Sequence, residues 1–267
     1  MLGQLNIAGL DMVEVSIKRL QMFEPEEGYY LAFSGGKDSV CIKALADMAG
    51  VKYDAHYSVT SVDPPELVRF VKTFPDVIFE YPRYSDGKVA TMWNLIPKKK
   101  MPPTRMVRYC CDVLKEQHGK GRFVVTGVRH AESAKRKGRG GLEIGQGRQR
   151  ERLDPDNPDQ EMIHRCQTKS QRILNPIIDW DNDDVWEFIR RYDLKYCSLY
   201  DEGFKRLGCI GCPIGEKNNR FREFEYYPRM QNLYVRAFEK MLFERRKNNM
   251  ETTWKDAEEV MNWWLSQ

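Results

Sequence analysis

A glycine pair between an apolar run and an amphipathic stretch constrains the fold of this chain more than any other feature. The apolar residues 29–33 predict a buried strand, the sequence Ser-Gly-Gly-Lys-Asp-Ser occupies positions 34–39, and the spacing of apolar residues over 40–46 predicts a helix. Glycines at such a strand-to-helix turn let backbone N–H groups face an anion, which the positive end of the helix dipole attracts. We therefore expect residues 34–39 to bind phosphate.

The loop differs from two common phosphate-binding motifs. A Walker loop ending in Gly36 and Lys37 would need glycine in place of Leu31 and a serine or threonine in place of Asp38. The Gly-x-Gly-x-x-Gly pattern does not match these positions either. The alternative interpretation is a polar strand-to-helix turn that binds no ligand.

Strand-like and helix-like segments alternate along the chain beyond the loop. Further strands are predicted at residues 53–59, 77–81, 123–126 and 173–178, with helices after Pro65, after Gly87, over 111–118 and after Asp181. This alternation predicts an α/β fold with a doubly wound, mostly parallel sheet and helices on both of its faces.

Three segments lie outside the alternation. Residues 8–23 have the spacing of an amphipathic helix, and the residues from about 228 onward predict a helical C-terminal extension. Residues 135–159 are rich in Gly, Arg, Lys, Asp and Pro and have no hydrophobic period. We expect a long mobile loop there.

The composition is that of a globular protein. Its 267 residues are 41% hydrophobic, enough for a core, and its formal net charge of +4 does not by itself indicate a polyanion partner. No run reaches the roughly 18 apolar residues that span a bilayer, and the N-terminus lacks the apolar core of a signal peptide. We expect a cytoplasmic protein without a membrane partner.

Four of the seven cysteines form a pattern typical of a metal site. Cys110 and Cys111 are adjacent, and Cys209 and Cys212 form a Cys-x-x-Cys far downstream. Four thiolates supplied in this way suit an iron–sulfur cluster or Zn²⁺, and unliganded or redox-paired thiols are the remaining alternative.

The other three cysteines have no partner in the pattern. Cys41 lies within the first predicted helix, where we expect a buried packing role. Cys166 and Cys197 would each serve as a sulfur-carrying thiol if exposed.

The loop at residues 34–39 resembles the PP-loop of the ATP pyrophosphatases and of the adenylyl-sulfate and phosphoadenylyl-sulfate (PAPS) reductases. The resemblance extends over about residues 28–215. Residues 126–136 are similar to the family's Gly-x-Arg-x-x-x-Ser-x-x-Arg segment, and residues 175–186 are similar to its closing strand and helix. It implies an adenine nucleotide α-hydrolase-like fold.

The resemblance also implies roles for individual residues. Lys37 would neutralise developing charge, Asp38 would face Mg²⁺ or the nucleotide, and Arg129 and Arg136 would clamp the phosphate or sulfate end of the substrate. The implied catalytic residues are therefore Lys37, Asp38, Arg129 and Arg136. The implied nucleotide-binding residues are Ser34, Gly35, Gly36, Lys37, Asp38, Ser39, Asp63 and Gly127.

The cysteine pattern resembles the [4Fe-4S] site of adenylyl-sulfate reductases and of DNA phosphorothioation sulfurtransferases. By this resemblance the ligands are Cys110, Cys111, Cys209 and Cys212, with zinc as the alternative metal. The reductases carry a nucleophilic cysteine in a C-terminal Glu-Cys-Gly-x-His-like segment, and this chain has no cysteine after Cys212 and no histidine after His164. That departure favours sulfur transfer over sulfate reduction.

We therefore predict an enzyme that binds ATP or a related adenylate with Mg²⁺, adenylates a substrate with release of pyrophosphate and takes part in sulfur transfer. A basic patch indicates a nucleic-acid substrate, with a solvated basic loop as the alternative; it comprises Lys135, Arg136, Lys137, Arg139, Arg148, Arg150 and Arg152. A cysteine desulfurase is the expected kind of sulfur donor.

Two other functions stay open at this point. One is a reductase of adenylyl sulfate or PAPS, with Cys166, Cys197 or a partner protein as the nucleophile. The other is a non-catalytic nucleotide-binding subunit of a DNA-modification system. The predicted organisation is an N-terminal helix over 1–27, a PP-loop nucleotide-binding and cluster domain over 28–215 and a helical extension over 216–267.

Overall fold

The computed structural model describes residues 11–134, 136–146, 149–157, 171–215 and 217–267. The chain forms two compact units, of which the first comprises Met1–Tyr57, Glu66–Phe79 and Gly119–Leu207. The second unit comprises Ser58–Pro65, Glu80–His118 and Gly208–Gln267. The domain boundaries predicted at residues 27 and 215 stay predictions.

The described residues of the chain form a seven-stranded sheet with the order β3-β2-β1-β4-β7-β5-β6. Its strands are β1 (Tyr29–Ala32), β2 (Tyr53–Ser58), β3 (Val77–Glu80), β4 (Phe123–Val125), β5 (Leu142–Gln146), β6 (Gln149–Leu153) and β7 (Arg172–Leu174). Strand β1 pairs in parallel with β2 and β4, and β4 pairs in parallel with β7. The predicted α/β class and mostly parallel sheet are confirmed, and the central strands are apolar because they are buried.

Helices flank this sheet in the first unit. They are α1 (Met12–Met22), α2 (Lys37–Ala49), α3 (Pro65–Val71) and α7 (Asn182–Arg191), with the short 3₁₀ turns η1 (His130–Glu132), η2 (Arg136–Gly138) and η3 (Ser198–Tyr200). Asp11 caps α1 and Asp181 caps α7, each through a capping box with the third helical residue. Helix α2 packs against both α1 and α7. The predicted N-terminal helix is therefore present from Met12 onward, and its predicted residues 8–10 lie outside the described residues.

The expectation of a long loop over residues 135–159 was wrong. Strands β5 and β6 form an antiparallel pair, and β5 also pairs antiparallel with β7, so this segment completes one edge of the sheet. Leu142 and Ile144 are buried, and Leu153 is buried on the facing strand. Glu143, between Leu142 and Ile144, is buried as well, so residues 142–144 of β5 show no alternation of buried and exposed residues, and glycines and charged residues surround its apolar positions. Residues 135, 147–148 and 158–159 of that segment are not among those described.

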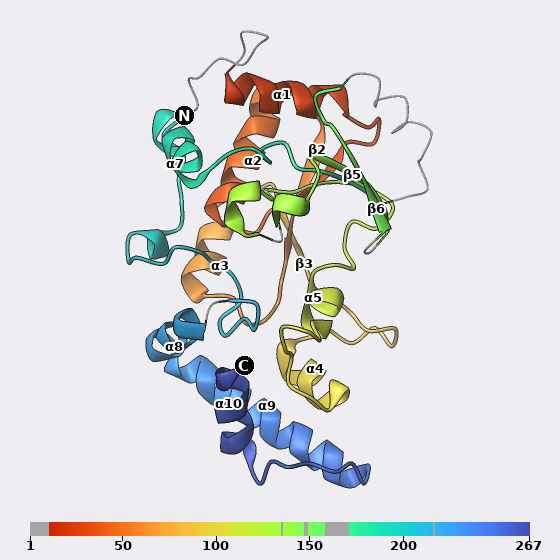
Figure 1. Cartoon of the computed structure of the whole chain (residues 1–267), viewed down its shortest axis with the longest axis vertical. Coiled ribbons are helices and arrows are strands. Elements are labelled where there is room, and N and C mark those ends of the chain that lie inside the picture. Colours follow the sequence, from red (N-terminus) through yellow and green to blue (C-terminus); the bar gives the residue numbers. More distant parts are fainter. Residues whose placement is uncertain (1–10, 135, 147–148, 158–170, 216) are drawn as a thin grey trace. The chain divides into compact units, whose positions relative to one another are not determined.

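Helices dominate the second unit. They are α4 (Met92–Lys99), α5 (Tyr109–Leu114), α8 (Lys217–Tyr226), α9 (Pro228–Lys247) and α10 (Ala257–Ser266), the last three drawn in blue in Figure 1. Helices α4 and α10 pack against α9 around fully buried Leu95, Phe238 and Trp264. The Trp264 indole donates a 2.6 Å hydrogen bond to the carbonyl of Pro103, which satisfies its only polar group. The predicted helical C-terminal region is confirmed.

None of the helices that the structure describes is both long and apolar enough to cross a membrane.

Candidate functional site

Glycine is required at two points of close approach, one in the loop between β1 and α2 and one in the segment after β4 that contacts the start of α2. Gly35 has φ +74°, and a Cβ there would lie 2.5 Å from Val71 Cγ2 and 2.8 Å from Leu67 Cδ1. Both the backbone conformation and the lack of space therefore demand glycine. Gly127, just after β4, would bring a Cβ within 3.0 Å of the Cβ of Asp38, so the chain passes directly against the start of α2.

Two hydroxyl groups hold the loop in place. Ser39 Oγ donates a 2.7 Å hydrogen bond to the carbonyl of Gly36, the residue that caps α2. Ser34 Oγ lies 3.3 Å from Ser39 Oγ and 3.4 Å from the amide nitrogen of Gly36. The loop is thus fixed at the N-terminus of a 13-residue helix, where the N–H groups of the first turn and the helix dipole favour an anion.

The side chains of Lys37, Asp38 and Arg129 form a buried charge network at the same place. Asp38 Oδ1 accepts hydrogen bonds from Lys37 Nζ at 3.1 Å and from Arg129 Nε at 2.7 Å. Asn182 Oδ1 accepts from Arg129 Nη2 at 3.0 Å and lies 3.4 Å from Lys37 Nζ, while Arg129 Nη1 donates to the carbonyl of Trp180. Two cations share one carboxylate, so this network carries excess positive charge where an anion would bind.

Burial shapes the electrostatics of this network. Arg129 is only 1% exposed, and its guanidinium group is held in one orientation by its partners. Desolvation lowers the pKa of Lys37, Asp38 opposes that shift, and Arg129 adds to it.

Arg136 lies in an environment rich in positive charge. Its guanidinium group forms an ion pair with Glu132, whose carboxylate also accepts the backbone N–H of Arg129 at 3.1 Å. Burial, together with the nearby charges of Arg206 and Arg139, lowers the pKa of Arg136 to about 10, although Asp38 opposes this shift. An anion placed here would relieve this repulsion.

Sequence reasoning missed Asn182, Tyr200 and Arg206. The Tyr200 hydroxyl accepts a 2.9 Å hydrogen bond from the backbone N–H of Lys37, and Asn182 joins the two cations described above. The one available signal was for Asn182, which follows the recognisable helix cap Asp181. The contact of Tyr200 with the loop spans 163 residues and leaves no local pattern.

The four cysteines of the predicted metal site all belong to the second unit. Cys110 and Cys111 open α5, while Cys209 and Cys212 bracket a tight turn in which the Cys212 N–H donates to the Cys209 carbonyl at 3.2 Å. A thiol–thiol hydrogen bond raises the pKa of Cys110 and lowers that of Cys111 to about 6, and the charges of Cys209 and Cys212 act on Cys110 as well. The structure thus brings the four thiols within electrostatic reach of one another.

Cys209 has further partners in the same unit. Its Sγ lies 3.6 Å from Thr60 Oγ1 and 4.0 Å from Asp63 Oδ1, and the Lys115 ammonium interacts with it. Burial raises the pKa of Cys209 to about 11, although Lys115 opposes that shift. Asp63, predicted as a nucleotide-binding residue, therefore lies beside a cysteine and also accepts the backbone N–H of Thr60 at 3.1 Å.

The donor chemistry of these cysteines suits an iron–sulfur cluster or zinc, because both metals favour thiolate ligands. Among the residues that the structure describes, no three or more His, Cys, Asp or Glu side chains are arranged as a ligand set for a metal ion. The assignment of the four cysteines as ligands stays a prediction.

The remaining three cysteines are Cys41, Cys197 and Cys166, and the structure describes the first two. Cys41 is fully buried on α2, with its Sγ 3.8 Å from the carbonyl of Val185, so its expected packing role is confirmed. Cys197 is 1% exposed and packs with Leu67 and Leu199, so it does not meet the condition of exposure set for a sulfur-carrying thiol. Cys166 lies outside the described residues.

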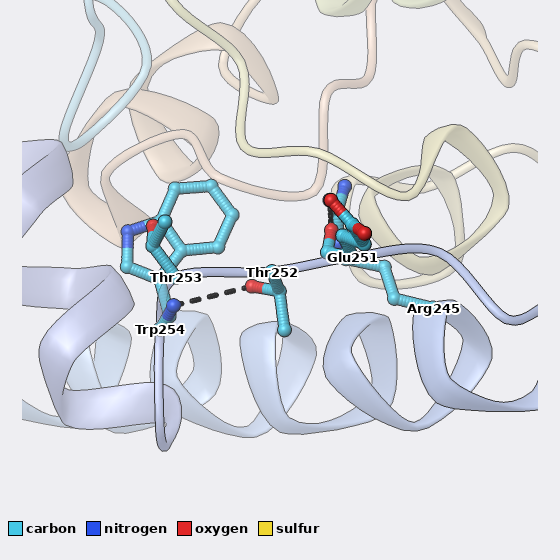
Figure 2. Close-up of a pocket in the computed structure, with 5 residues that line it drawn as sticks. All are labelled: Arg245, Glu251, Thr252, Thr253 and Trp254. Atoms are coloured by element: carbon cyan, nitrogen blue, oxygen red, sulfur yellow. Dashed lines mark hydrogen bonds between the residues drawn. The ribbon is translucent and has the colours of Figure 1, made fainter.

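An open pocket of about 450 Å³ lies in the second unit and is lined by Arg245 and residues 251–254 (Figure 2). The Arg245 guanidinium donates to the carbonyls of Lys100 and Glu251, and the Trp254 N–H lies 3.2 Å from Thr252 Oγ1. The pocket contains none of the predicted site residues, and its guanidinium group is already engaged by main-chain oxygens.

A mostly parallel α/β sheet, a glycine loop between its strand β1 and a helix, and a cationic network at that helix N-terminus define an α/β protein of the PP-loop type. The chain belongs to the phosphoadenosine phosphosulfate reductase domain family, whose model matches residues 28–214. The family-level resemblance found in the sequence is confirmed.

Two curated proteins are similar to this chain over about three quarters of its length. An uncharacterized protein of Methanocaldococcus jannaschii is 30% identical over 211 residues, which cover 76% of this chain and 46% of that protein. A second uncharacterized protein of that organism is 27% identical over 213 residues, 73% of this chain and 38% of its own length. The chain thus spans less than half the length of these relatives.

An adenosine 5'-phosphosulfate reductase of Staphylococcus haemolyticus is 43% identical over a short stretch of 44 residues, 16% of this chain and 18% of that protein. Among solved structures, a phosphoadenylyl-sulfate reductase from Candida auris aligns over 76% of this chain and 90% of its own, with 15% identity and a TM-score of 0.49.

Proposed function

We propose that this chain binds ATP or a related adenylate through its phosphate groups at residues 34–39, and that it adenylates a substrate with release of pyrophosphate. The observation that carries the proposal is the pair of buried cations, Lys37 and Arg129, held by one carboxylate at the N-terminus of α2. This arrangement offers main-chain donors, a helix dipole and fixed positive charge to a polyphosphate.

In the proposed reaction an oxygen of the substrate attacks the α-phosphorus, and the bond to the leaving pyrophosphate breaks. Negative charge develops on the leaving oxygens, where Lys37 and Arg129 would stabilise it. Their anchoring by Asn182 and the Trp180 carbonyl supports this role, because preorganised charges need little rearrangement during the reaction. Asp38, whose carboxylate Lys37 and Arg129 share, is the loop residue that we propose to contact Mg²⁺, a cation that prefers oxygen ligands.

We propose that Cys110, Cys111, Cys209 and Cys212 hold a [4Fe-4S] cluster, with zinc as the alternative. Their mutual interaction within one unit and their soft donor atoms support the assignment. A bound cluster would supply the sulfur or redox chemistry of a sulfur-transfer reaction. The surrounding residues Thr60, Asp63 and Lys115 would orient the sulfur of Cys209 and balance its charge.

A nucleic acid is the acceptor that we propose, with a cysteine desulfurase as the sulfur donor. The supporting feature is the set of arginines from η2 to β6, because guanidinium groups suit phosphate oxygens. The described members of that set are Arg136, Arg139, Arg150 and Arg152. Arg139 and Arg150 contact Glu143, and Arg136 pairs with Glu132, so a phosphate bound by these three arginines would compete with the two carboxylates.

Reduction of adenylyl sulfate or PAPS is the second candidate function. The short stretch of high identity to a named adenosine 5'-phosphosulfate reductase favours it. The two functions differ in product, since the reductase releases sulfite and the adenylating enzyme releases pyrophosphate.

The experiment uses protein purified without oxygen, incubated in parallel with ATP plus DNA or RNA, and with adenylyl sulfate or PAPS plus a dithiol. Pyrophosphate release that depends on nucleic acid supports our proposal. Sulfite release identifies the reductase instead. ATP binding without either product favours a nucleotide-binding subunit.

A further inference from the structure

The hydroxyl group of Tyr200 lies at the N-terminus of the helix that follows the loop. It accepts the backbone N–H of Lys37 at 2.9 Å, and a Cβ added at Gly36 would lie 3.5 Å from the same oxygen. The phenol therefore reaches the first turn of α2, where main-chain donors face an incoming anion.

The ring of Tyr200 is anchored by its neighbours. Trp186 meets it edge-on with ring centroids 5.1 Å apart, and Tyr196 lies 6.4 Å away. The ring also packs against the buried side chains of Leu67 and Leu199. Because these contacts fix the ring, its hydroxyl stays at the loop when an anion arrives.

The chemistry of the phenol allows it to bind phosphate directly. A hydroxyl that accepts one hydrogen bond still has a proton to donate. Burial raises the pKa of Tyr200, and the negative charge of Asp38 raises it further, so the hydroxyl keeps this proton at neutral pH.

We propose that Tyr200 is a phosphate-binding residue of this site, whose hydroxyl donates a hydrogen bond to an oxygen of the phosphate bound at the first turn of α2. The proposal rests on the proposed function, in which residues 34–39 hold the phosphate groups of an adenine nucleotide. In this arrangement Tyr200 contacts the phosphate end of the ligand and does not contact the adenosine.

Tyr200→Phe tests this because phenylalanine keeps the ring and removes only the hydroxyl. Calorimetric titration with inorganic pyrophosphate and with ATP should give a dissociation constant roughly ten- to hundred-fold weaker than that of the wild type, as expected for one hydrogen bond to a charged group. Tyr196→Phe is the matched control: its ring also contacts Trp186, at 5.3 Å, but its hydroxyl bonds to Asp201 instead of the loop. We expect this control to bind like the wild type.

The outcomes separate this inference from the proposed function. If Lys37→Ala loses pyrophosphate binding and Tyr200→Phe keeps it, the loop binds phosphate and the role of Tyr200 is wrong. Tighter binding by Tyr200→Phe would overturn the inference too, because the hydroxyl would then cover the loop instead of contacting the ligand. A wild-type protein that binds neither pyrophosphate nor ATP overturns both. Thermal unfolding of the two tyrosine variants checks that each is folded.

Discussion

Arg129 Nε donates a 2.7 Å hydrogen bond to Asp38 Oδ1 across 91 residues of sequence. This bond joins the segment after β4 to the first turn of α2. Residues 34–39 and 126–136, which each resemble a motif of the same family, therefore form one charge network. The bond also determines how Asp38 acts, since its carboxylate is shared by Arg129 and Lys37.

Removal of the Arg129 side chain should weaken both ligand binding and the fold. We expect Arg129→Met to destabilise the protein by about 2–4 kcal/mol, because it leaves Asp38 and Asn182 without their buried partner. Urea denaturation measures this change. Arg191→Met is the control, since the Arg191–Glu187 pair is exposed and should contribute less than about 1 kcal/mol. If both variants lose the same free energy of unfolding, the buried network does not stabilise the fold more than an exposed ion pair does.

Gly35→Ala should cost more stability than a change at another glycine with positive φ. Gly87 has φ +82° and no atom within 4 Å of an added Cβ, so Gly87→Ala reports the backbone cost alone, about 1 kcal/mol. At Gly35 the added methyl would also collide with Val71 and Leu67, which we expect to add about 1–3 kcal/mol. The difference between the two unfolding free energies is the measurement, and a difference near zero would contradict the crowding described here.

The pH dependence of ATP binding should reveal the lowered pKa of Lys37. A lysine whose pKa is lowered by burial is protonated below that pKa and becomes neutral above it, so phosphate affinity should fall as pH rises through a value below the usual 10.5. In Lys37→Arg, the guanidinium keeps its charge and the fall should move to higher pH. Identical profiles for the two proteins would mean that Lys37 does not contact the phosphate.

If the four cysteines are ligands, substitutions of these cysteines and of other cysteines should differ in their effect on metal content. Cys209→Ser should lower the iron and acid-labile sulfide content of anaerobically purified protein and reduce a broad absorbance near 400 nm, as is general for iron–sulfur proteins. Cys197→Ser should leave the metal content unchanged, since Cys197 is buried elsewhere among leucines. Zinc without iron would support the alternative metal, and full metal content in Cys209→Ser would remove Cys209 from the ligand set.

The parts of the fold that the sequence predicted are those encoded in local patterns. The run from residue 29 to 46 carried the strand, the glycine turn and the helix in one stretch, and the alternation of apolar segments indicated the parallel sheet. Strands β5 and β6 were missed because their few apolar residues stand among glycines and charged residues, and the charged Glu143 is itself buried, which the sequence gives no reason to expect.

The site was predictable only in part, for a similar reason. Lys37, Asp38 and Arg129 lie in recognisable segments, and the structure brings them together. Tyr200 and Asn182 reach the same place through tertiary contacts that span more than a hundred residues, which no local spacing reveals. Asp63 was expected near the nucleotide, and its contact with Cys209 likewise depends on tertiary packing.

Residues 34–39 with the two cations Lys37 and Arg129 should bind the phosphate groups of an adenine nucleotide. The measurement is calorimetric titration of ATP with Mg²⁺ into the wild type, Lys37→Ala and Lys88→Ala, of which the last is the control because Lys88 is exposed and lies outside the loop. We expect the wild type and Lys88→Ala to bind one ATP with equal affinity and Lys37→Ala to bind it at least ten-fold more weakly. Equal affinity in all three proteins, or no binding by the wild type, would contradict it.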